Sequence, residues 1–338
     1  MNNKKIVAPT FGGPEVLQVV EEAIPEPGEG ELLVKMLTAG VSFADVMWMS
    51  GTVPGGPKAP FTPGYDVVGT VQKVGPGVSD LAVGERVAAQ VHYGGYAEYV
   101  VVPSRQGVKL PAEMDPVRAV CAILNYLTAY QIYHRVAHVT DQPGTRVLIH
   151  GAAGGVGTAL LDLGRLFGFE MYGTARRSKQ GAVTKLGGTP IDYEAEDFVE
   201  GILKRTRTGV DLVIDPIGGP HFWQSFRTLR RGGHLVATAS MASVRGLSML
   251  RTILYYMQVS LWDFLPNGRS ATFLDLEVLN EKNPTWYQED LPRVLRYLAE
   301  GKIDPLVARV MPLTKAAEAH RLLLDRQVEG KIVLVPGP

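Results

Sequence analysis

A glycine-rich turn between a short apolar run and an amphipathic segment constrains this chain more than any other stretch. Residues 146–150 (RVLIH) are typical of a buried parallel strand, and the sequence GAAGGVG follows them at residues 151–157. From Val156 to Phe167 the apolar residues recur at helical spacing. Glycine lets a pyrophosphate approach bare backbone at a helix N-terminus, where unpaired N–H groups and the helix dipole attract an anion. The pattern therefore predicts a dinucleotide-binding strand, turn and helix rather than a glycine-rich turn without a ligand.

The second predicted strand, residues 169–175, ends where an NAD-dependent protein carries an acidic residue for the ribose 2′-hydroxyl. This chain has no acid there and instead continues with Arg176, Arg177, Ser178 and Lys179. Cations at this place suit the additional 2′-phosphate of NADP. For each single residue the alternative is a solvated charge that opens the next helix. The three cations together predict NADP as the cofactor.

The composition excludes several classes of protein. The 34 Lys and Arg balance the 34 Asp and Glu, so no overall field attracts nucleic acid or a membrane surface. The single cysteine, Cys121, excludes an internal disulfide and a cysteine-rich zinc site, and it suits a reducing compartment. The N-terminal sequence has no apolar signal core, so we expect a cytoplasmic protein.

Two patterns of predicted elements divide the chain into two domains of an α/β protein. From about residue 5 to 107, short β-type runs broken by Gly and Pro predict a mainly antiparallel domain, closed or nearly closed. A helix over residues 115–136 leads from it into the second domain. Alternating elements then predict a doubly wound parallel sheet. Its strands are expected at 146–150, 169–175, 189–193, 210–214 and 234–238, and its helices at 156–167, 178–186, 196–206 and 220–230.

The remaining segments are less regular. Residues 51–65, rich in proline, predict a long surface loop that borders a binding site. Residues 247–265 are apolar but interrupted by charges, which disfavours membrane spanning and predicts a helix over a cleft or a subunit interface. Association with a membrane surface is the alternative for this segment. Beyond it we expect an edge strand over 271–278, a helix over 288–300, and a strand–helix–strand tail that returns to the N-terminal domain.

Seven blocks of sequence resemble the zinc-independent quinone oxidoreductases of the medium-chain dehydrogenase/reductase family, and among them most of all the vesicle amine transport protein branch. The blocks are AGVSFADV (39–46), PGYDVVGTV (63–71), NYLTAY (125–130), HGAAGGVG (150–157), GTARRSK (173–179), DLVIDPIGG (211–219) and the C-terminal EGKIVLVPGP. The resemblance implies a GroES-like β-barrel domain, residues 1–122 and 303–338, and an NADP-binding Rossmann domain, residues 123–302. It also implies NADPH, a cleft between the domains and commonly a homodimer.

The chain departs from the zinc-containing relatives where those carry metal ligands. They have Cys, a Gly-His-Glu triplet and a second Cys, and the matching places here are Ser42, Gly64-Tyr65-Asp66 and Leu124. None of these three places offers a good zinc ligand, so we expect no metal. The histidines show no metal-ligand spacing either, and His150 is expected to be structural. The chemistry implied is hydride transfer from NADPH to a quinone or to the β-carbon of an α,β-unsaturated carbonyl compound.

The resemblance also implies which residues hold the cofactor. They come from the glycine turn, the ends of the second and third strands, the 115–136 helix and the tail: Gly154, Gly155, Val156, Gly157, Lys179, Tyr193, Thr128 and Arg326. The turn residues line the pyrophosphate, and Thr128 lies near the nicotinamide amide. Lys179 and Tyr193 hold the adenosine phosphate, and Arg326, placed in the tail helix, reaches the same region. At least one of Arg176 and Arg177, which replace small residues of many relatives, is expected to strengthen the preference for NADP.

Four residues are candidates for the substrate side: Ser42, Asp45, Tyr65 and Asn125. Ser42 stands where many quinone oxidoreductases have Asn, and its hydroxyl is expected to replace that amide at shorter reach. Asp45 either orients a water or closes a structural hydrogen bond, and we favour the structural role. Tyr65 and Asn125 face either the cleft or the core. None of the four has a pairing that identifies a general acid.

Three functions fit these patterns. The first is an NADPH-dependent, zinc-free quinone or enone oxidoreductase. The second is a pathway-specific enoyl or 2-alkenal reductase with the same cofactor half. The third is an NADPH-binding, membrane-associated protein with little turnover, which the absent Asn at position 42 and the apolar segment 247–265 favour. The complete set of phosphate-binding residues favours an enzyme.

Overall fold

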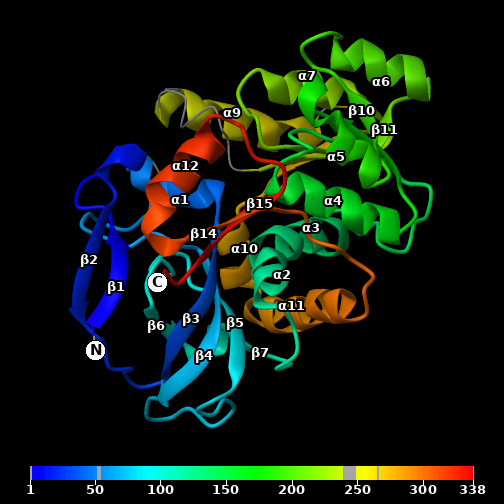
Figure 1. Cartoon of the computed structure of the whole chain (residues 1–338). Coiled ribbons are helices and arrows are strands. Elements are labelled where there is room, and N and C mark those ends of the chain that lie inside the picture. Colours follow the sequence, from blue (N-terminus) through cyan, green and yellow to red (C-terminus); the bar gives the residue numbers. More distant parts are fainter. Residues whose placement is uncertain (1, 52–54, 239–248, 265, 338) are drawn as a thin grey trace. The chain divides into compact units, whose positions relative to one another are not determined.

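The computed structural model describes residues 2–51, 55–238, 249–264 and 266–337. Contacts divide the chain into two compact units (Figure 1). Unit 1 consists of Met1–Leu127 and Thr285–Pro338, and unit 2 consists of Thr128–Pro284. The contacts group residues 123–127 and 285–302 with unit 1, whereas the sequence assigned them to the nucleotide domain. The domain boundaries at 122/123 and 302/303 stay a prediction.

Unit 1 is built on a seven-stranded, mainly antiparallel sheet. Its strands follow the order β14-β15-β3-β4-β5-β7, and β6 pairs with β3. The strands are β3 (Glu31–Val41), β4 (Asp66–Val74), β5 (Arg86–Gln90), β6 (Tyr99–Pro103), β7 (Gly107–Leu110), β14 (Val307–Pro312) and β15 (Lys331–Val335). A separate antiparallel pair consists of β1 (Asn2–Val7) and β2 (Gln18–Ala23). Because β15 pairs with β3, the tail returns to the N-terminal domain, as the sequence predicts.

Helices and short 3-10 turns complete unit 1. They are α1 (Phe43–Ser50), α2 (Pro116–Cys121), α11 (Pro284–Ala299), α12 (Ala316–Leu324), η1 (Pro14–Val16), η2 (Ser104–Gln106) and η7 (Leu313–Lys315). Helix α2 begins at Asp115, whose carboxylate accepts the N–H of Val117 at 3.0 Å. It continues into a π-helical turn, η3 (Ala122–Tyr126). Apolar side chains of the sheet form the core of unit 1, and Val34, Val71 and Leu334 in it are fully buried.

Unit 2 contains a six-stranded parallel sheet with helices around it (Figure 1). Its strands are β8 (Arg146–Ile149), β9 (Glu170–Thr174), β10 (Thr189–Ile191), β11 (Val210–Asp215), β12 (Leu229–Ala237) and β13 (Ser270–Phe273). Its helical elements are α3 (Leu127–Gln131), η4 (Ile132–Val136), α4 (Gly155–Leu166), η5 (Arg177–Lys179), α5 (Gln180–Lys185), α6 (Phe198–Thr206), α7 (His221–Arg227), α9 (Met249–Leu261), η6 (Trp262–Phe264) and α10 (Leu276–Lys282). The doubly wound α/β fold expected from the alternating pattern is confirmed.

The strand order of unit 2 defines where a ligand is received. The order is β10-β9-β8-β11-β12-β13, so the chain first moves outward from β8 in one direction and later outward from β11 in the other. Ligands of such sheets bind beyond the carboxyl ends of the strands at the point where the order reverses. In this protein that point lies between β8 and β11. The glycine turn after β8 therefore stands where the fold receives its ligand.

Two predicted boundaries in unit 2 are wrong. The strand expected over 271–278 ends at Phe273, because Asp275 starts helix α10 by accepting the N–H of Val278 at 3.2 Å. The helix expected over 220–230 ends at Arg227, and β12 begins at Leu229 because that residue pairs with Val210 of β11. Strand β13 does lie at the edge of the sheet, as expected.

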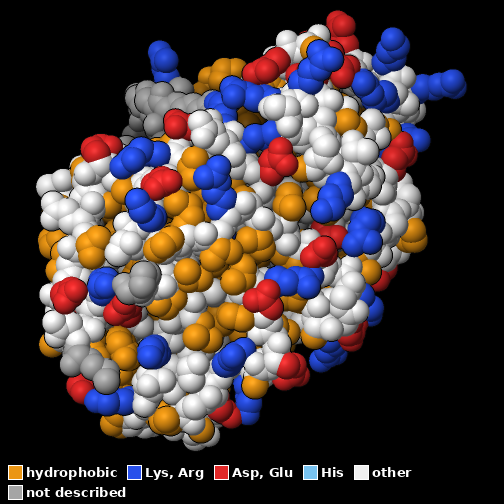
Figure 2. All heavy atoms as spheres, in the orientation of Figure 1, with side chains coloured by type: hydrophobic (Ala, Val, Ile, Leu, Met, Phe, Trp, Pro, Cys, Tyr) orange, Lys and Arg blue, Asp and Glu red, His pale blue; other side chains and the backbone are white. Residues whose placement is uncertain are grey.

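The two irregular segments are described in part. Residues 249–264 form α9 and η6, which confirms a helix in the apolar segment, whereas residues 247, 248 and 265 lie outside the described part. None of the described helices is long and apolar enough to cross a membrane. Residues 55–65 of the loop carry no helix or strand, and Phe61 is bonded to Ala8 by an isolated bridge. The surface in Figure 2 mixes cationic and anionic side chains, in keeping with the balanced composition.

Candidate functional site

The glycine turn presents a helix N-terminus that no described side chain caps. Gly154 is the N-cap of α4 with extended backbone, and its N–H donates to the carbonyl oxygen of Gly151 at 2.9 Å. The N–H groups of Gly155, Val156 and Gly157 open the helix and have no acceptor within it. These groups and the helix dipole stabilise an anion placed beyond them. The turn thus has the geometry of a pyrophosphate cradle.

Two glycines of the turn serve different purposes. A Cβ on Gly157 would lie 2.4 Å from the carbonyl oxygen of Gly151 and 2.7 Å from Cα of Ala152, so this glycine lets the helix pack against the turn. A Cβ on Gly154 would meet a single neighbour, that same carbonyl oxygen, at 3.2 Å. Protein packing therefore requires glycine strongly at 157 and only mildly at 154. The space beside Gly154 is left for a ligand.

The predicted cations follow β9, the strand next to β8. The Nε of Arg176 donates to the hydroxyl of Tyr193 at 3.1 Å and lies 3.0 Å from a carboxylate oxygen of Glu194. The structure thus brings two predicted cofactor residues, Arg176 and Tyr193, into direct contact. Arg177 is exposed and has no partner among the described residues. Because Glu194 already compensates Arg176, Arg177 is the cation with its charge available.

Thr128 and Arg326 are described within separate units. Thr128 is buried in the helical segment at the start of unit 2. The expectation that Arg326 belongs to the tail helix is wrong, because α12 ends at Leu324 and Arg326 adopts a left-handed backbone with φ 55°. Its N–H donates to the carbonyl oxygen of Leu323 at 3.1 Å, which closes the turn after the helix. The cofactor roles of both residues stay predictions.

Ser42 and Asp45 form a buried cap at the start of α1. The Ser42 hydroxyl and N–H both donate to Oδ2 of Asp45 at 2.8 Å. In return, the N–H of Asp45 donates to the Ser42 hydroxyl oxygen at 3.3 Å. Oδ1 of Asp45 accepts the N–H of Gly64 at 2.9 Å. The single proton of the Ser42 hydroxyl is therefore committed to the cap. This geometry supports the structural role of Asp45 and weakens Ser42 as a donor to a substrate.

The cap extends to the tail helix through Tyr96. Its hydroxyl donates to Oδ2 of Asp45 at 3.0 Å and lies 3.2 Å from Nε2 of His320 on α12. Burial raises the pKa of Asp45 and lowers the pKa of His320 to about 4. Because the phenol has one proton, Nε2 of a neutral His320 is the donor to the phenol oxygen, and its Nδ1 has no partner among the described residues.

Asn125 differs from the other three substrate-side candidates because no hydrogen bond within the described part of the chain holds its polar group. It is 6 % exposed, it lies in the π-helical turn η3, and its amide has no hydrogen bond among the described residues. The amide atoms are not fully enclosed by protein, so the tip of this side chain reaches solvent. Tyr65 differs, because its hydroxyl lies 3.2 Å from Nδ1 of His92 and the rings meet edge to face. Helical π-turns occur frequently at functional sites.

A buried ion pair accepts a hydrogen bond from the backbone of the residue before Asn125. Nζ of Lys331 contacts Oδ2 of Asp66 at 2.6 Å, and the N–H of Leu124 donates to the same oxygen at 3.3 Å. Both charged side chains are excluded from water, and burial raises the pKa of Asp66 despite the ammonium beside it. Asp66 and Leu124 are at two of the places that the sequence analysis matched to the metal ligands of zinc-containing relatives. Here these groups are bonded to each other and to Lys331.

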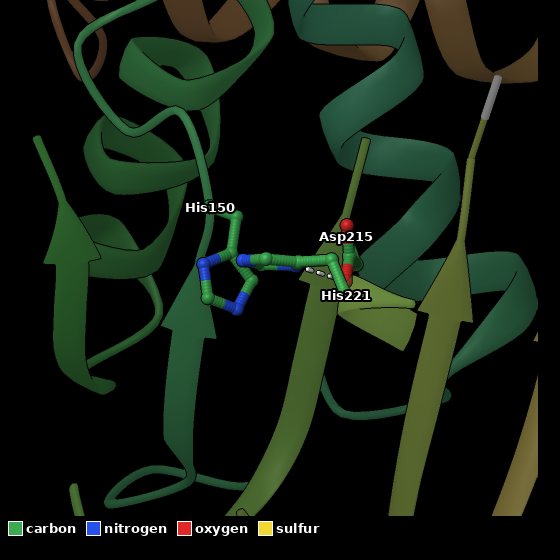
Figure 3. Close-up of side chains that lie close together, drawn as sticks. All are labelled: His150, Asp215 and His221. Carbon is green, nitrogen blue, oxygen red and sulfur yellow. Dashed lines mark hydrogen bonds and ion pairs between the residues drawn. The ribbon is translucent and has the colours of Figure 1, made fainter. Parts of the chain in front are cut away.

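A cluster that the sequence analysis missed joins the ends of β8 and β11 (Figure 3). His150, Asp215 and His221 each offer a ligand or proton-binding atom within 4.8 Å of the others. Nδ1 of His221 lies 2.7 Å from Oδ2 of Asp215, and the hydroxyl of Ser225 donates to the same oxygen at 2.6 Å. The spacing along the chain gave no sign of it, because only the adjacency of two parallel strands brings His150 to Asp215. The strand order expected for a doubly wound sheet could have predicted the cluster, because it places the ends of these two strands side by side.

The two units and the cradle define a dinucleotide-binding α/β protein, and comparisons place it in a family. A model of the alcohol dehydrogenase GroES-like domain matches residues 28–112, and one described as zinc-binding dehydrogenase matches residues 186–334. The human synaptic vesicle membrane protein VAT-1 homolog is 34% identical over 342 residues, which cover 98% of this chain and 86% of that protein.

Solved structures agree with this placement. Escherichia coli quinone oxidoreductase complexed with NADPH is 28% identical, with a TM-score of 0.87 over 98% of this chain and 100% of that one. The CurK enoyl reductase is 26% identical, with a TM-score of 0.85 over 99% of each chain. The chain belongs to the quinone oxidoreductase-like group of the medium-chain dehydrogenase/reductases, a family of oxidoreductases.

Proposed function

We propose that the protein is an NADPH-dependent, zinc-free oxidoreductase that transfers hydride to quinones or to α,β-unsaturated carbonyl compounds. One observation carries the proposal: an uncapped glycine N-terminus at the switch point of a doubly wound sheet, with an unpaired arginine at the end of the neighbouring strand. The relative from Escherichia coli was solved with NADPH, which supports the same cofactor here. The missing acid after β9 supports NADPH over NADH.

The residues of unit 2 fit the phosphates of NADPH. The N–H groups of Gly155, Val156 and Gly157 would hold the pyrophosphate, and the space beside Gly154 admits it. Arg177 would hold the 2′-phosphate, together with Lys179, while Arg176 is fixed by Glu194 and orients Tyr193. When bound, the cofactor supplies the hydride.

Asn125 is the residue we assign to the substrate carbonyl. As hydride reaches the β-carbon, negative charge develops on the carbonyl oxygen, and a fixed N–H donor stabilises it. With no acceptor among the described residues, the N–H groups of the Asn125 amide are free to donate to the carbonyl oxygen, whereas the Ser42 hydroxyl already donates its proton to Asp45. The proton that completes the reduction comes from solvent or from a hydroxyl, and Tyr65 is the candidate hydroxyl among the predicted residues.

The absence of zinc from this chemistry is supported by the donor set. Zinc prefers thiolate, imidazole and carboxylate ligands. At the three matching places the chain has a capping serine, a tyrosine with a carboxylate already paired to Lys331, and a leucine. Reduction of an activated C=C or of a quinone needs no Lewis acid to hold an alkoxide.

Two further functions have an observation in their favour. The likeness to CurK enoyl reductase supports a reductase that serves one pathway, with the same cofactor half. Leu254, Met257 and Leu261 on α9 are all more than half exposed, and this stripe supports the membrane-associated alternative with little turnover. We rank both below a general reductase. The pathway-specific reductase has the same cofactor chemistry as a general one, so no contact in the cofactor half favours it, and the membrane-associated protein would leave the phosphate cradle unused.

Assembly and location are proposed on less direct grounds. In the described part of unit 2, β13 pairs only with β12, and its other edge offers backbone groups to a second strand. We propose that two copies of the chain pair at this edge and form a homodimer. A cytoplasmic location fits the single buried cysteine and remains a proposal.

Steady-state assays test the proposed function. NADPH oxidation is followed with a panel of quinones and conjugated enones, in parallel with NADH and with a metal chelator. We expect turnover that prefers NADPH and persists in chelator. Loss of activity in chelator that added zinc restores would contradict a zinc-free mechanism. NADPH binding without oxidation of any panel member would contradict a general reductase and leave the pathway-specific reductase and the membrane-associated protein.

A further inference from the structure

The cluster at the ends of β8 and β11 belongs to a continuous chain of hydrogen bonds. It begins at the N–H of Gly151, which donates to the hydroxyl of Thr174 at 3.3 Å. The Thr174 hydroxyl lies 3.1 Å from Nδ1 of His150, and Nε2 of His150 lies 3.1 Å from the hydroxyl of Ser225. The chain ends at Asp215, which accepts from Ser225 and lies 2.7 Å from Nδ1 of His221.

The direction of every proton in this chain follows from its ends. Hydrogen bonds from His221 and Ser225 outweigh burial and lower the pKa of Asp215 to about 2, so its carboxylate is ionised and accepts. The one proton of Ser225 therefore goes to Asp215, and its oxygen accepts from Nε2 of His150. Burial lowers the pKa of His150 to about 3, so the ring is neutral and Nδ1 accepts from Thr174. The hydroxyl of Thr174 is left to accept the N–H of Gly151.

The chain holds the two loops that meet at the switch point. At one end, Thr174 fixes Gly151, the first residue of the glycine turn, whose left-handed φ is 66°. At the other end, Oδ1 of Asp215 accepts the N–H groups of Ile217 at 2.7 Å and Gly218 at 3.3 Å, which fixes the loop between β11 and α7. Thr174, His150, Ser225 and Asp215 are all buried. The dinucleotide lies across these loops in this class of sheet.

A metal site fits the same atoms less well. Oδ2 of Asp215 lies 2.6 Å from the Ser225 hydroxyl and 2.7 Å from Nδ1 of His221, and both are hydrogen-bond distances with a proton between the two atoms. Both oxygens of Asp215 and both nitrogens of His150 already have partners. A cation would have to displace these protons and break the chain that fixes both loops.

We propose that Thr174, His150 and Ser225 are positioning residues for the dinucleotide, which act through the glycine turn and the β11–α7 loop. The inference rests on the proposed function in taking NADPH as the ligand. The chain sets the turn before the cofactor arrives, so that the first N–H groups of α4 already point at the phosphates. Breaking it at Thr174 weakens cofactor binding beyond any loss of stability.

The test compares two buried threonines of unit 2 with the same kind of bonding. Thr206 at the end of α6 accepts the N–H of Gly209 at 3.1 Å and donates to the carbonyl oxygen of Ile202 at 2.8 Å. It precedes β11 and so lies near the amino ends of the parallel strands, whereas Thr174 ends β9 at the carboxyl end. Thr174→Val and Thr206→Val therefore remove similar hydroxyls, and Thr174→Ser keeps the hydroxyl. The readouts are the melting temperature and the NADPH dissociation constant.

We expect both valine variants to melt at similarly reduced temperatures, and only Thr174→Val to raise the NADPH dissociation constant, by about tenfold. Thr174→Ser should bind NADPH as the wild type does. Equal NADPH affinity in the two valine variants would overturn the inference alone, whereas a wild-type protein that binds no NADPH would overturn the proposed function and the inference with it. A stoichiometric metal ion in the purified wild type that His221→Ala removes would also overturn the inference, in favour of a metal site.

Discussion

In unit 2 both oxygens of the Asp215 carboxylate accept hydrogen bonds, whereas in unit 1 Oδ1 of the equally buried Asp66 has no donor among the described residues. The pKa of Asp215 is accordingly lowered to about 2 by its partners, while burial raises the pKa of Asp66. The polar chain of unit 2 is saturated and keeps one fixed set of protons. In unit 1 the Asp66 carboxylate depends on a single ammonium, that of Lys331, to balance its charge.

The difference matches the role proposed for each unit. A receptor for phosphates gains from N–H groups that are fixed before the anion arrives, because no free energy is then spent on ordering them. A site that stabilises charge during a reaction gains instead from hydrogen-bond donors that are not yet used, such as the unpaired amide of Asn125. The Asp215 chain of unit 2 is therefore the saturated network, and the Asp66–Lys331 pair next to Asn125 in unit 1 is the unsaturated one.

The largest expected effect comes from breaking the ion pair of unit 1. Lys331→Met leaves the buried Asp66 carboxylate without its cation, with the N–H of Leu124 as its remaining donor in the described part of the chain, and we expect it to lower the free energy of unfolding by about 3–5 kcal/mol. The double variant Asp66→Asn with Lys331→Met removes both charges and should be much more stable than Lys331→Met alone. Denaturant unfolding of the three proteins measures this. Equal stability of the two variants would mean that the Lys331 ammonium is not needed to balance the charge of Asp66.

The second prediction concerns the open amide of unit 1. Asn125→Ala removes the donor to the carbonyl oxygen, so we expect kcat to fall about 100-fold while the NADPH dissociation constant stays unchanged. Ser42→Ala is the matched control, because its hydroxyl caps α1 and should affect the melting temperature more than kcat. A kcat that drops in Ser42→Ala and not in Asn125→Ala would reverse the assignment of the substrate donor.

The third prediction follows from the buried histidines, one in each unit. Burial lowers the pKa of His150 to about 3 and that of His320 to about 4, from 6.5 in the unfolded chain. Because the unfolded state takes up the proton first, stability is fully present above pH 6.5 and is lost as the pH falls. At pH 5 each histidine should cost about 2 kcal/mol relative to pH 7.

Stability curves from pH 7 to 4 check this. Asp215 and His221 face His150, and the Tyr96–Asp45 pair faces His320, so His150→Gln and His320→Gln are compared with wild type over the same range. Each variant should show a shallower loss of stability with falling pH. A wild-type slope that neither substitution reduces would contradict neutral buried imidazoles in both units.

The smallest effect separates the two arginines after β9. Arg177 is unpaired and Arg176 is tied to Glu194, so Arg177→Ala should raise the NADPH dissociation constant about tenfold and Arg176→Ala by less. Neither should change NADH affinity, because NADH lacks the 2′-phosphate. Isothermal titration with both cofactors measures the four values. A larger loss in Arg176→Ala would show that Glu194 does not neutralise it.

The sequence predicted the elements of unit 2 well because its strands are short apolar runs and its turns carry glycine. It failed where one residue decides a boundary, as at Asp275, which ends a β-type run by capping a helix. It also placed Arg326 inside α12, although the chain adopts a left-handed turn there. Such element boundaries depend on single hydrogen bonds, which cannot be predicted from the spacing of apolar residues.

The candidate site was predictable in its cofactor half and not in its polar networks. The glycine turn and the cations are contiguous motifs, so their chemistry is visible in the sequence. The link from Tyr96 to His320 spans 224 residues, and that from His150 to Ser225 spans 75. Only the order and register of the strands bring these partners together. The Ser42–Asp45 cap was an exception, since serine followed three residues later by an acid is a local signature.

The transfer of a labelled hydride tests the central claim most directly. The protein is incubated with a conjugated enone and NADPH that carries deuterium at the transferable C4 position, and the product is analysed by NMR spectroscopy and mass spectrometry. Direct transfer predicts one deuterium at the β-carbon of the product and one hydrogen from water at the α-carbon. A reduced product without deuterium at the β-carbon, or no product from any enone or quinone despite bound NADPH, would contradict the account.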